Sequence, residues 1–297
     1  MKLRAILLLL ITFCTAKAQH YSLFSQYVVN GLVINPAYAG RNDVMDITAM
    51  HRQQWFGLGG APITTSFSAH SPLRKKSINV GISVVDDRIG ITTNQLISGM
   101  YAYRFQAGKF KLSFGVQGGY QMRRINWDAL IKNDPNDILV LNQAQSKGGL
   151  NFGAGYYMYS DNLFAGVSLP YVMNSFSKGG VSQSPLLFNA GCLYKISEEH
   201  TLKPSLLFKY IKGSPMQTDL NLSYCYKQIF GLGFSYRTKE SLVAIAEIGI
   251  SEQLKVCYSY DMGVTKIKKY HNGSHEILIR YCFGYSTHAK NPRAFLN

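Results

Sequence analysis

The sequence predicts an all-β protein: an up-and-down antiparallel transmembrane β-barrel of about fourteen strands, with an N-terminal segment outside the barrel wall. Apolar and polar residues alternate with a period of two in segment after segment, and tight and long connections alternate between the segments. Only 16% of the residues are charged, yet no apolar run reaches the roughly 20 residues of a spanning helix. A closed sheet is the other structure in which every backbone N–H and C=O group can be hydrogen-bonded within a bilayer.

The first eighteen residues have the three parts of a secretory signal peptide. Basic residues precede a short apolar stretch, and Ala16-Lys17-Ala18 forms a small-x-small cleavage site. We therefore assign residues 1–18 to a signal peptide and expect the mature chain to begin at Gln19. Its removal takes away three of the basic residues that contribute to the formal net charge of +15.

Residues 19–42 do not alternate like the strands that follow them. Asn35-Pro36 and Ala39-Gly40 are turn signals, and apolar residues such as Leu32 and Ile34 indicate that this segment packs against another part of the protein. The lumen of a barrel of about fourteen strands is wider than side chains alone can fill. The segment is therefore a candidate plug, or alternatively a periplasmic contact.

The barrel is expected to span residues 43–285, followed by a C-terminal tail over 286–297. Within 217–226, for example, leucines and tyrosines occupy one parity and mostly polar residues the other, so one face suits lipid and the other a polar lumen. The expected strands are 44–55, 62–70, 77–87, 94–105, 109–124, 150–159, 162–171, 187–196, 202–211, 216–227, 229–237, 241–250, 254–263 and 274–284.

A soluble β-sandwich with a dry core is the main alternative, because its strands also alternate. Against it, the second parity carries Gly, Ser, Gln and scattered charges in most segments, and all of the segments follow one rhythm. Strand ends rich in tyrosine, such as 101–103 and 156–159, are also typical of the aromatic girdles of membrane barrels.

Several charged residues fall on the parity that faces the lumen. Opposite charges on an inner wall usually pair and help to fill a lumen, although they can also line a channel. The expected lumen charges are Lys111, Arg123, Glu247, Lys255, Glu276 and Arg280.

A basic group occupies the last long connection, at Lys266, Lys268 and Lys269. If both termini are periplasmic, these lysines lie on the outer rim. Basic groups are attracted to anionic membrane surfaces, so outer-membrane lipid or lipopolysaccharide is a candidate partner, with a simply solvated rim as the alternative. Nucleic acid is not an expected partner of an exported barrel, despite the positive charge.

The sequence lacks recognised catalytic, metal and phosphate motifs. It contains neither H-E-x-x-H nor a complete G-x-S-x-G, and the cysteines after the signal peptide show no C-x-x-C spacing. We expect no enzyme activity, no cofactor and no metal, and single buried cysteines. A hydrolase within the barrel is a minor alternative, because catalytic triads assemble in space rather than in sequence.

Short motifs follow one another through the first third of the chain. They are Ser25-Gln26-Tyr27 with Asn30, Asn35-Pro36-Ala37-Tyr38-Ala39-Gly40, Arg52-Gln53-Gln54-Trp55, Gly60-Ala61-Pro62, Ser66-Phe67, His70-Ser71-Pro72, Gly81 to Gly90, and Tyr101-Ala102-Tyr103-Arg104. In order and spacing they resemble the PorP/SprF family of type IX secretion system outer-membrane proteins. The resulting candidates for motif or partner-contact residues are Gln26, Asn30, Asn35, Pro36, Tyr38, Gly40, Arg52, Gln54 and Trp55.

The resemblance implies an outer-membrane protein of the Bacteroidetes that assists the export or surface attachment of secreted proteins, including gliding adhesins. Its partners would be components of the type IX secretion machinery and secreted surface proteins that bear a C-terminal secretion domain. The residues alone leave a second function open, that of a passive porin or a channel for small hydrophobic molecules.

Overall fold

The computed structural model describes residues 24–74, 76–127, 146–174 and 184–283. The signal peptide expected over 1–18 and the tail expected over 286–297 lie outside the described residues. None of the helices in the described part of the chain is long and apolar enough to cross a bilayer.

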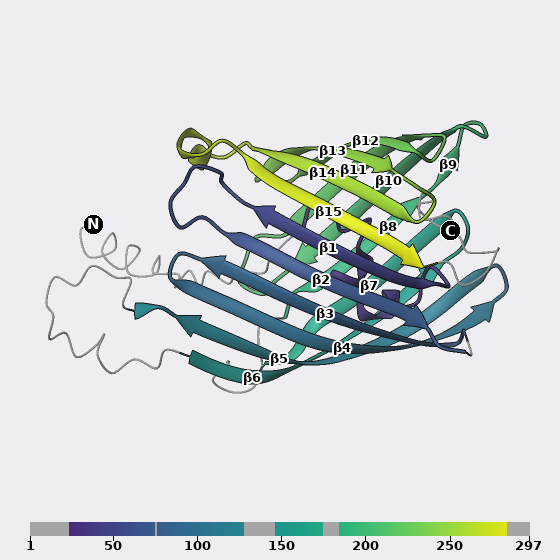
Figure 1. Ribbon diagram of the computed structural model, residues 1–297, viewed down its shortest axis with the longest axis horizontal. Helices are drawn as coiled ribbons and strands as arrows, with labels where there is room; N and C mark the ends of the chain where they lie inside the picture. The colour runs from purple at the N-terminus through teal and green to yellow at the C-terminus, as the bar shows by residue number, and fades with distance from the viewer. Residues whose placement is uncertain (1–23, 75, 128–145, 175–183, 284–297) are drawn as a thin grey trace, which may run out of the picture.

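Fourteen antiparallel strands close into a barrel (Figure 1), which confirms the predicted fold class and strand number. Each strand pairs with its neighbours in the sequence, and the seam closes where β1 pairs with β15, from Met45 opposite Phe283 to Gln53 opposite His275. A closed sheet has no free edge, so every strand has a hydrogen-bonding neighbour on both sides.

The strands agree with the expected segments to within a few residues at most ends. Their bounds are β1 Met45–Gln53, β2 Ile63–Pro72, β3 Ile78–Ile89, β4 Thr92–Ala107, β5 Phe110–Ile125, β6 Ser146–Tyr159, β7 Leu163–Asn174, β8 Leu186–Cys192, β9 Tyr194–Lys195, β10 His200–Tyr210, β11 Gln217–Tyr226, β12 Phe230–Arg237, β13 Ser241–Gly249, β14 Leu254–Gly263 and β15 Ser274–Phe283.

The expected strand over 187–196 is divided in two. β8 pairs with β10, and the short extra strand β9 pairs with β10 farther along the same edge. Between them, the register places Pro204 on β10 opposite Cys192, and proline has no N–H to donate to the ladder. The backbone N–H of Leu193 donates to the carbonyl of Asn162 at 2.8 Å, in line with the pairing of β7 with β8. The strand is therefore interrupted opposite a proline of the neighbouring strand, which the alternation pattern of 187–196 does not reveal.

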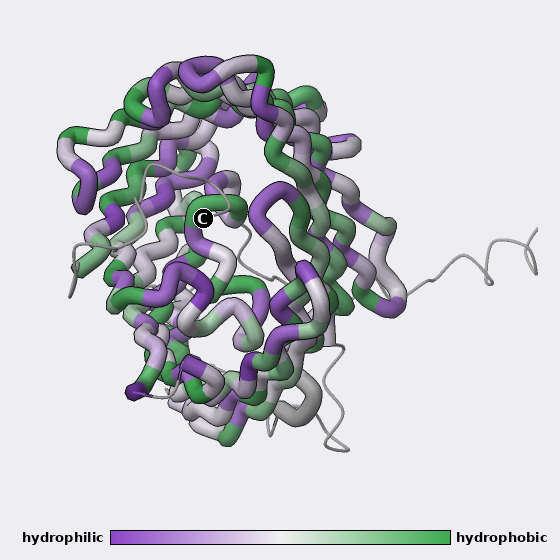
Figure 2. The backbone as a smooth tube through the Cα atoms, turned by 90° about the vertical axis from the view of Figure 1, so that its right-hand side faces the viewer, coloured by the Kyte–Doolittle hydropathy of each residue, from purple (hydrophilic) through white to green (hydrophobic). Residues whose placement is uncertain are grey.

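The two faces of the wall differ as the period-two pattern predicts. On β12, Leu232, Phe234 and Tyr236 point outward and are exposed, whereas Ser235 and Arg237 point inward and are buried. Figure 2 shows hydrophobic and hydrophilic residues alternating along the strands. An apolar outer surface that continues around a closed sheet is the surface of a membrane barrel, not of a soluble protein.

The two ends of the barrel have different connections. We call the end where β1 begins and β15 ends the terminal rim, and the opposite end the loop rim. Short turns such as 108–109 and 160–162 lie on the terminal rim, and the strand ends joined by the longest connections, β5 to β6 and β7 to β8, lie at the loop rim.

Residues 24–43 form what we call the lumen segment, seen in dark purple inside the barrel (Figure 1). The lumen segment has two short 3-10 helices, η1 Gly31–Val33 and η2 Pro36–Tyr38. Its buried apolar residues are Phe24, Tyr27, Val29, Leu32, Ile34, Ala37, Tyr38 and Ala39. All three buried hydrophobic clusters found among the described residues contain members of this segment, so the core lies between the segment and the wall.

Candidate functional site: the lumen segment and its anchors

The first residues of the lumen segment bind carboxylates of the wall. The backbone N–H groups of Ser25 and Gln26 each donate to one oxygen of Glu276 on β15, both at 2.9 Å. The Ser25 hydroxyl donates to Asp261 on β14, at 2.8 Å to one of its oxygens. Gln26 also donates through its side chain to the carbonyl of Glu276, at 3.2 Å. The peptide backbone of the segment thus completes a charged site on the barrel wall.

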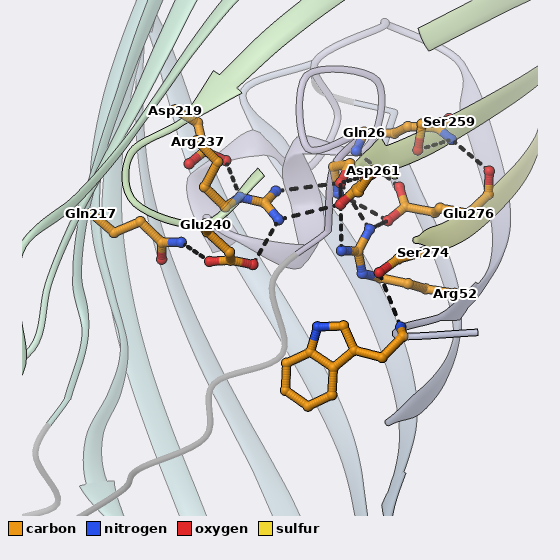
Figure 3. Close-up of polar contacts among 12 residues, drawn as sticks. Gln26, Arg52, Gln217, Asp219, Arg237, Glu240, Ser259, Asp261, Ser274 and Glu276 are labelled. Atoms are coloured by element: carbon orange, nitrogen blue, oxygen red, sulfur yellow. Dashed lines mark hydrogen bonds and ion pairs between the residues drawn. The ribbon is translucent and has the colours of Figure 1, made fainter. Parts of the chain in front are cut away.

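Two arginines join these carboxylates into one network, shown in Figure 3. Arg52 on β1 donates to Asp261 at 2.6 Å and to Glu276 at 2.9 Å. Arg237 on β12 donates to Asp219 on β11 at 2.9 Å and lies 3.5 Å from Asp261. Both guanidinium groups are almost fully buried, with side chains 2% and 1% exposed. We call Ser25 and these five charged residues the loop-rim anchor.

Buried charges are stable only when they are paired and hydrogen-bonded. The loop-rim anchor sets three carboxylates, Asp219, Asp261 and Glu276, against two guanidinium groups. The additional negative charge is met by the N–H and hydroxyl donors of the lumen segment. The segment is therefore part of the charge balance of the wall.

The middle of the lumen segment lies against backbone groups of the opposite wall. Asn35 donates to the carbonyl of Tyr156 on β6 at 3.0 Å, and its side-chain oxygen accepts from the N–H of Ala37, which caps η2. Ser168 on β7 donates to the carbonyl of Ile34 at 2.6 Å. Asn30, earlier in the segment, donates to the hydroxyl of Ser68 on β2 at 3.0 Å.

Glycines on the inner face make room for η2. A Cβ on Gly115 of β5 would overlap backbone atoms of Pro36 and Ala37, and Gly155 of β6 would meet the Asn35 side chain in the same way. The Asn-Pro-Ala-Tyr motif thus lies directly on the wall backbone. The alternation pattern places glycines on the inner parity, but it does not indicate which of them the segment covers.

The end of the lumen segment is held by a second set of contacts near the terminal rim. The Gly40 carbonyl accepts from Arg104 on β4 at 2.9 Å, and Asp43 accepts from both Arg104 and Lys111 on β5. Gly40 adopts a left-handed φ of 72°, and a Cβ there would also overlap the side chain of Asn79. Only glycine fits this position.

Asp43 titrates below the usual range of an aspartate. Its partial burial acts to raise the pKa, but the positive charges of Arg104 and Lys111 and their hydrogen bonds outweigh that effect and lower the pKa. We call Asp43, Arg104 and Lys111 the terminal-rim anchor. The Lys111 side chain is 30% exposed, so the terminal-rim anchor is more accessible to water than the loop-rim anchor.

Most of the charges expected in the lumen lie in ion pairs. Lys255 on β14 lies 3.0 Å from Glu247 on β13, and Arg280 on β15 lies 2.6 Å from Asp46 on β1, with all four side chains buried or nearly so. Arg123 differs, because it lies exposed toward the loop rim and donates to Asn94 at 3.0 Å.

The charged partners Asp46, Asp219, Arg237 and Asp261 were not among the residues singled out from the sequence. Each lies on the inward parity of its strand, and that position was the available signal. Three of the four cysteines after the signal peptide, Cys225, Cys257 and Cys282, are also buried on this face; Cys192 is half-buried, and all four are free.

Gln54 and Trp55 lie where β1 meets the loop rim. The Trp55 backbone has a left-handed φ of 48°, and its N–H donates to the Ser274 hydroxyl at 3.1 Å. A small cavity of about 50 Å³ opens beside it. Its lining includes Arg52, Gln54, Trp55, Glu240, Ser241, Asp261, Thr265, Ile267, His271 and Ser274.

The basic residues Lys266, Lys268 and Lys269 lie in the 3-10 helix η4, Lys266–Tyr270, and are all exposed at the loop rim. Across the described ranges, no group of three His, Cys, Asp or Glu side chains is arranged to hold a metal ion. The arrangement inside the barrel is one that can hold a peptide segment by buried charges and backbone contacts.

Fold and site together define a class: an outer-membrane β-barrel with its own N-terminal segment inside the lumen. The Ralstonia pickettii toluene transporter TbuX is similar, with a TM-score of 0.52 and 8% identity over 86% of this chain and 93% of that chain. The Acinetobacter baumannii outer membrane protein Omp33 has a TM-score of 0.49 and 7% identity over 82% and 100%. At these identities, the likeness to TbuX establishes the fold alone. No curated protein matches the sequence.

The model of the type IX secretion system membrane protein PorP/SprF family matches residues 16–281. The chain belongs to this family, and the match extends well beyond the motifs in its first third. It is therefore an outer-membrane barrel of the type IX secretion system, a secretion or transport class of protein and not a class of enzyme.

Proposed function

We propose that this protein is a closed accessory barrel of type IX secretion, which binds secreted proteins and machinery partners at its rims and does not conduct solutes through its lumen. The observation that carries the proposal is the lumen segment, residues 24–43. Buried charges fix it near the loop rim, backbone contacts fix it to β6 and β7, and a second ion pair fixes it near the terminal rim.

A passive porin needs a continuous polar path through its lumen. Here, a solute would have to pass three buried apolar clusters that join the lumen segment to the wall. It would also have to displace Ser25 from Asp261 and Glu276, which would take hydrogen-bond donors away from two buried carboxylates. These costs favour a closed lumen.

The motif residues of the segment support a holding role. Gln26, Asn30, Asn35, Pro36 and Tyr38 are all buried inside the barrel and contact the wall or one another. The same holds for Gly40 and for Arg52 on β1. Side chains buried in this way are not accessible to a partner protein. We therefore expect the partner contacts at the rims of the barrel.

Trp55 is our candidate for such a contact. It lies at the loop rim beside a small cavity, and its left-handed φ is unusual for a bulky residue. Strained backbone of this kind tends to be kept at binding sites, at a cost of about 1–3 kcal/mol. Secreted substrates and their C-terminal secretion domains are the partners we expect at this rim, and machinery components at either rim.

Two measurements test the proposal. In planar bilayers we expect low conductance for the intact protein and a clear increase after deletion of residues 24–40, with folding verified by gel mobility before and after heating. In pull-downs from native outer membrane, analysed by mass spectrometry, we expect secreted or machinery proteins to be recovered, and recovered less with Trp55→Ala. The matched control is Trp127→Ala, the other tryptophan of the chain, which also lies near the loop rim.

High conductance of the intact barrel, with no co-purifying proteins, would contradict the proposal and favour a porin or a channel for small hydrophobic molecules. Unchanged conductance after the deletion would show that the segment does not close the lumen. Equal recovery with Trp55→Ala and Trp127→Ala would remove Trp55 from the binding surface.

A further inference from the structure

The small cavity beside Trp55, which we call the rim cavity, brings together three buried polar atoms that lack a hydrogen-bond partner among the described residues. They are Arg52 Nε, Ser241 Oγ and His271 Nε2, and all three residues belong to the cavity lining. They come from β1, from β13 and from the connection between β14 and β15. Buried polar atoms are costly when they are unpaired. Three of them on one small cavity indicate a site that a ligand completes.

The hydrogen bond at the other ring nitrogen of His271 fixes which atom can donate. The backbone N–H of Gly273 donates to Nδ1 at 2.9 Å, so in the neutral imidazole the ring hydrogen is on Nε2. The ring lies against the inner face of β14, where a Cβ on Gly263 would be 3.4 Å from Nε2. Its centroid is 6.3 Å from that of the Trp55 ring. His271 therefore gives the rim cavity an N–H donor.

Arg52 gives a second N–H donor. Its two terminal nitrogens bind Asp261 and Glu276, as Figure 3 shows, and its Nε–H has no partner. The third unpaired group, the Ser241 hydroxyl, can donate or accept. Two N–H groups require an acceptor, so the ligand carries an oxygen here and is not a cation.

The charges of the lining exclude an anion as well. The carboxylates of Asp261 and Glu240 both line the rim cavity. An anionic ligand would therefore lie beside two like charges. Each carboxylate oxygen has more than one acceptor site, so N–H groups of a ligand can bind there. A neutral group that accepts through oxygen and donates through nitrogen fits both requirements, and the amide is such a group.

The size of the rim cavity is that of one amide side-chain end. A cavity needs about 10–15 Å³ for each water-sized atom, so about 50 Å³ holds roughly four. The end of an asparagine or glutamine side chain has four non-hydrogen atoms: a methylene carbon, the carbonyl carbon, the oxygen and the nitrogen. A single hydroxyl group would leave most of the space empty.

The walls of the rim cavity are held together by backbone hydrogen bonds. The N–H of Phe56 donates to the carbonyl of Gly273 at 2.7 Å, and the N–H of Asn272 donates to the carbonyl of Phe56 at 2.8 Å. The β1–β2 and β14–β15 connections are thus joined beside the cavity. Thr265 belongs to the lining and is exposed, so the cavity reaches the surface of the loop rim.

We propose that the rim cavity binds the side-chain amide of an asparagine or glutamine of a partner polypeptide. The amide oxygen accepts from Arg52 Nε and His271 Nε2, and the amide nitrogen donates to Asp261 or Glu240. This inference rests on the proposed function, because it requires a polypeptide at the loop rim. It adds the chemical group that is inserted beside Trp55.

The test is a titration of the purified barrel in detergent micelles with acetamide, which is the amide group alone. In a Trp127→Phe background Trp55 is the only tryptophan, so ¹⁵N-tryptophan labelling gives one indole signal from the cavity lining. We expect acetamide to shift this signal saturably, with a dissociation constant on the order of 1 mM. Acetate, which has the same shape and a negative charge, should bind at least about tenfold more weakly.

Ser241→Ala and His271→Phe should each weaken acetamide binding about fivefold. The matched control is Ser98→Ala, because Ser98 Oγ on β4 is also buried and unpaired but lies outside the cavity lining. It should bind like the wild type. Gel mobility before and after heating verifies the folding of each variant, and Ser241→Ala, the mildest change, is sufficient for the test.

No saturable shift up to about 100 mM acetamide would show that the rim cavity holds only water, and would overturn the proposal. Acetate binding as tight as acetamide binding, or an equal loss with Ser98→Ala, would also overturn it. In pull-downs from native outer membrane, Ser241→Ala should lower the recovery of partners and Ser98→Ala should not.

The two proposals fail in distinguishable ways. If Trp55→Ala lowers partner recovery and Ser241→Ala does not, the proposed function stands and the amide site is wrong. Saturable acetamide binding with no co-purifying protein would contradict the proposed function and, with it, a polypeptide as the source of the amide.

Discussion

The two anchors of the lumen segment differ in burial and in how the chain reaches them. The loop-rim anchor holds the beginning of the segment through five charged residues, of which Arg52 and Arg237 are almost fully buried. The terminal-rim anchor holds the other end through Asp43, whose partner Lys111 is 30% exposed. Near the terminal rim the segment is also held by its covalent link to β1. The buried ion pairs are therefore concentrated at the loop-rim end of the lumen segment, which has no such covalent link to a strand of the wall.

The comparison predicts the largest loss of stability at the loop-rim anchor. Glu276→Ala removes the acceptor of Arg52 and of two backbone N–H groups, and it leaves a buried guanidinium group short of a partner. Loss of one member of a buried ion pair costs about 3–5 kcal/mol. Denaturant unfolding in detergent, together with protease sensitivity of the N-terminal segment, measures this effect.

Glu199→Ala is the matched control, because Glu199 pairs with Lys227 on the surface, with both side chains about half exposed. Surface pairs contribute about 0–1 kcal/mol. If Glu276→Ala cost no more than Glu199→Ala, the loop-rim anchor would not be a strong attachment.

A smaller loss is expected where the middle of the segment lies on glycine. Gly115→Ala places a Cβ against backbone atoms of Pro36 and Ala37, which cannot rotate away. Overpacking of this kind costs about 1–3 kcal/mol. Gly118→Ala on the same strand is the control, because its Cβ would meet only the Phe152 ring, at 3.6 Å. Equal melting temperatures of the two variants would argue against close contact between η2 and β5.

The smallest effect is expected at the terminal-rim anchor. Asp43→Asn should cost about 1 kcal/mol near neutral pH, because the Asn side-chain oxygen can still accept from the buried Arg104, Lys111 is 30% exposed, and the covalent link to β1 remains. The folded-state pKa of Asp43 is lowered, so its stabilisation is complete above the unfolded pKa of about 3.9 and is lost as the pH falls through the folded value.

The difference in stability between wild type and Asp43→Asn should therefore shrink in acid. Unfolding curves at neutral pH and below pH ~3 measure it. A difference that grows as the pH falls would have the wrong sign for a carboxylate held in its charged form.

The fold was predictable because strands have a period of exactly two. Leu220, Leu222 and Tyr224 face lipid and Asp219 and Asn221 face inward, as the alternation requires. The break between β8 and β9 was not predictable from the alternation of 187–196, because it lies opposite Pro204 on β10 and depends on the register of the two strands.

The site was less predictable than the fold. The parity of Asp261 and Arg237 places them inside, but parity does not say which inward residues meet. The lumen segment has no repeating pattern, so nothing in its sequence gives its direction. That Ser25 lies near the loop rim and Gly40 near the terminal rim follows only from contacts between residues more than 200 and more than 60 positions apart.

The barrel seam has a consequence for assembly. Arg52 and Glu276 are direct cross-strand partners where β1 pairs with β15 to close the barrel, and both bind Ser25. The residues that bring the first and last strands together are thus the same residues that receive the start of the segment. We therefore expect closing of the wall and seating of the lumen segment to be coupled during folding.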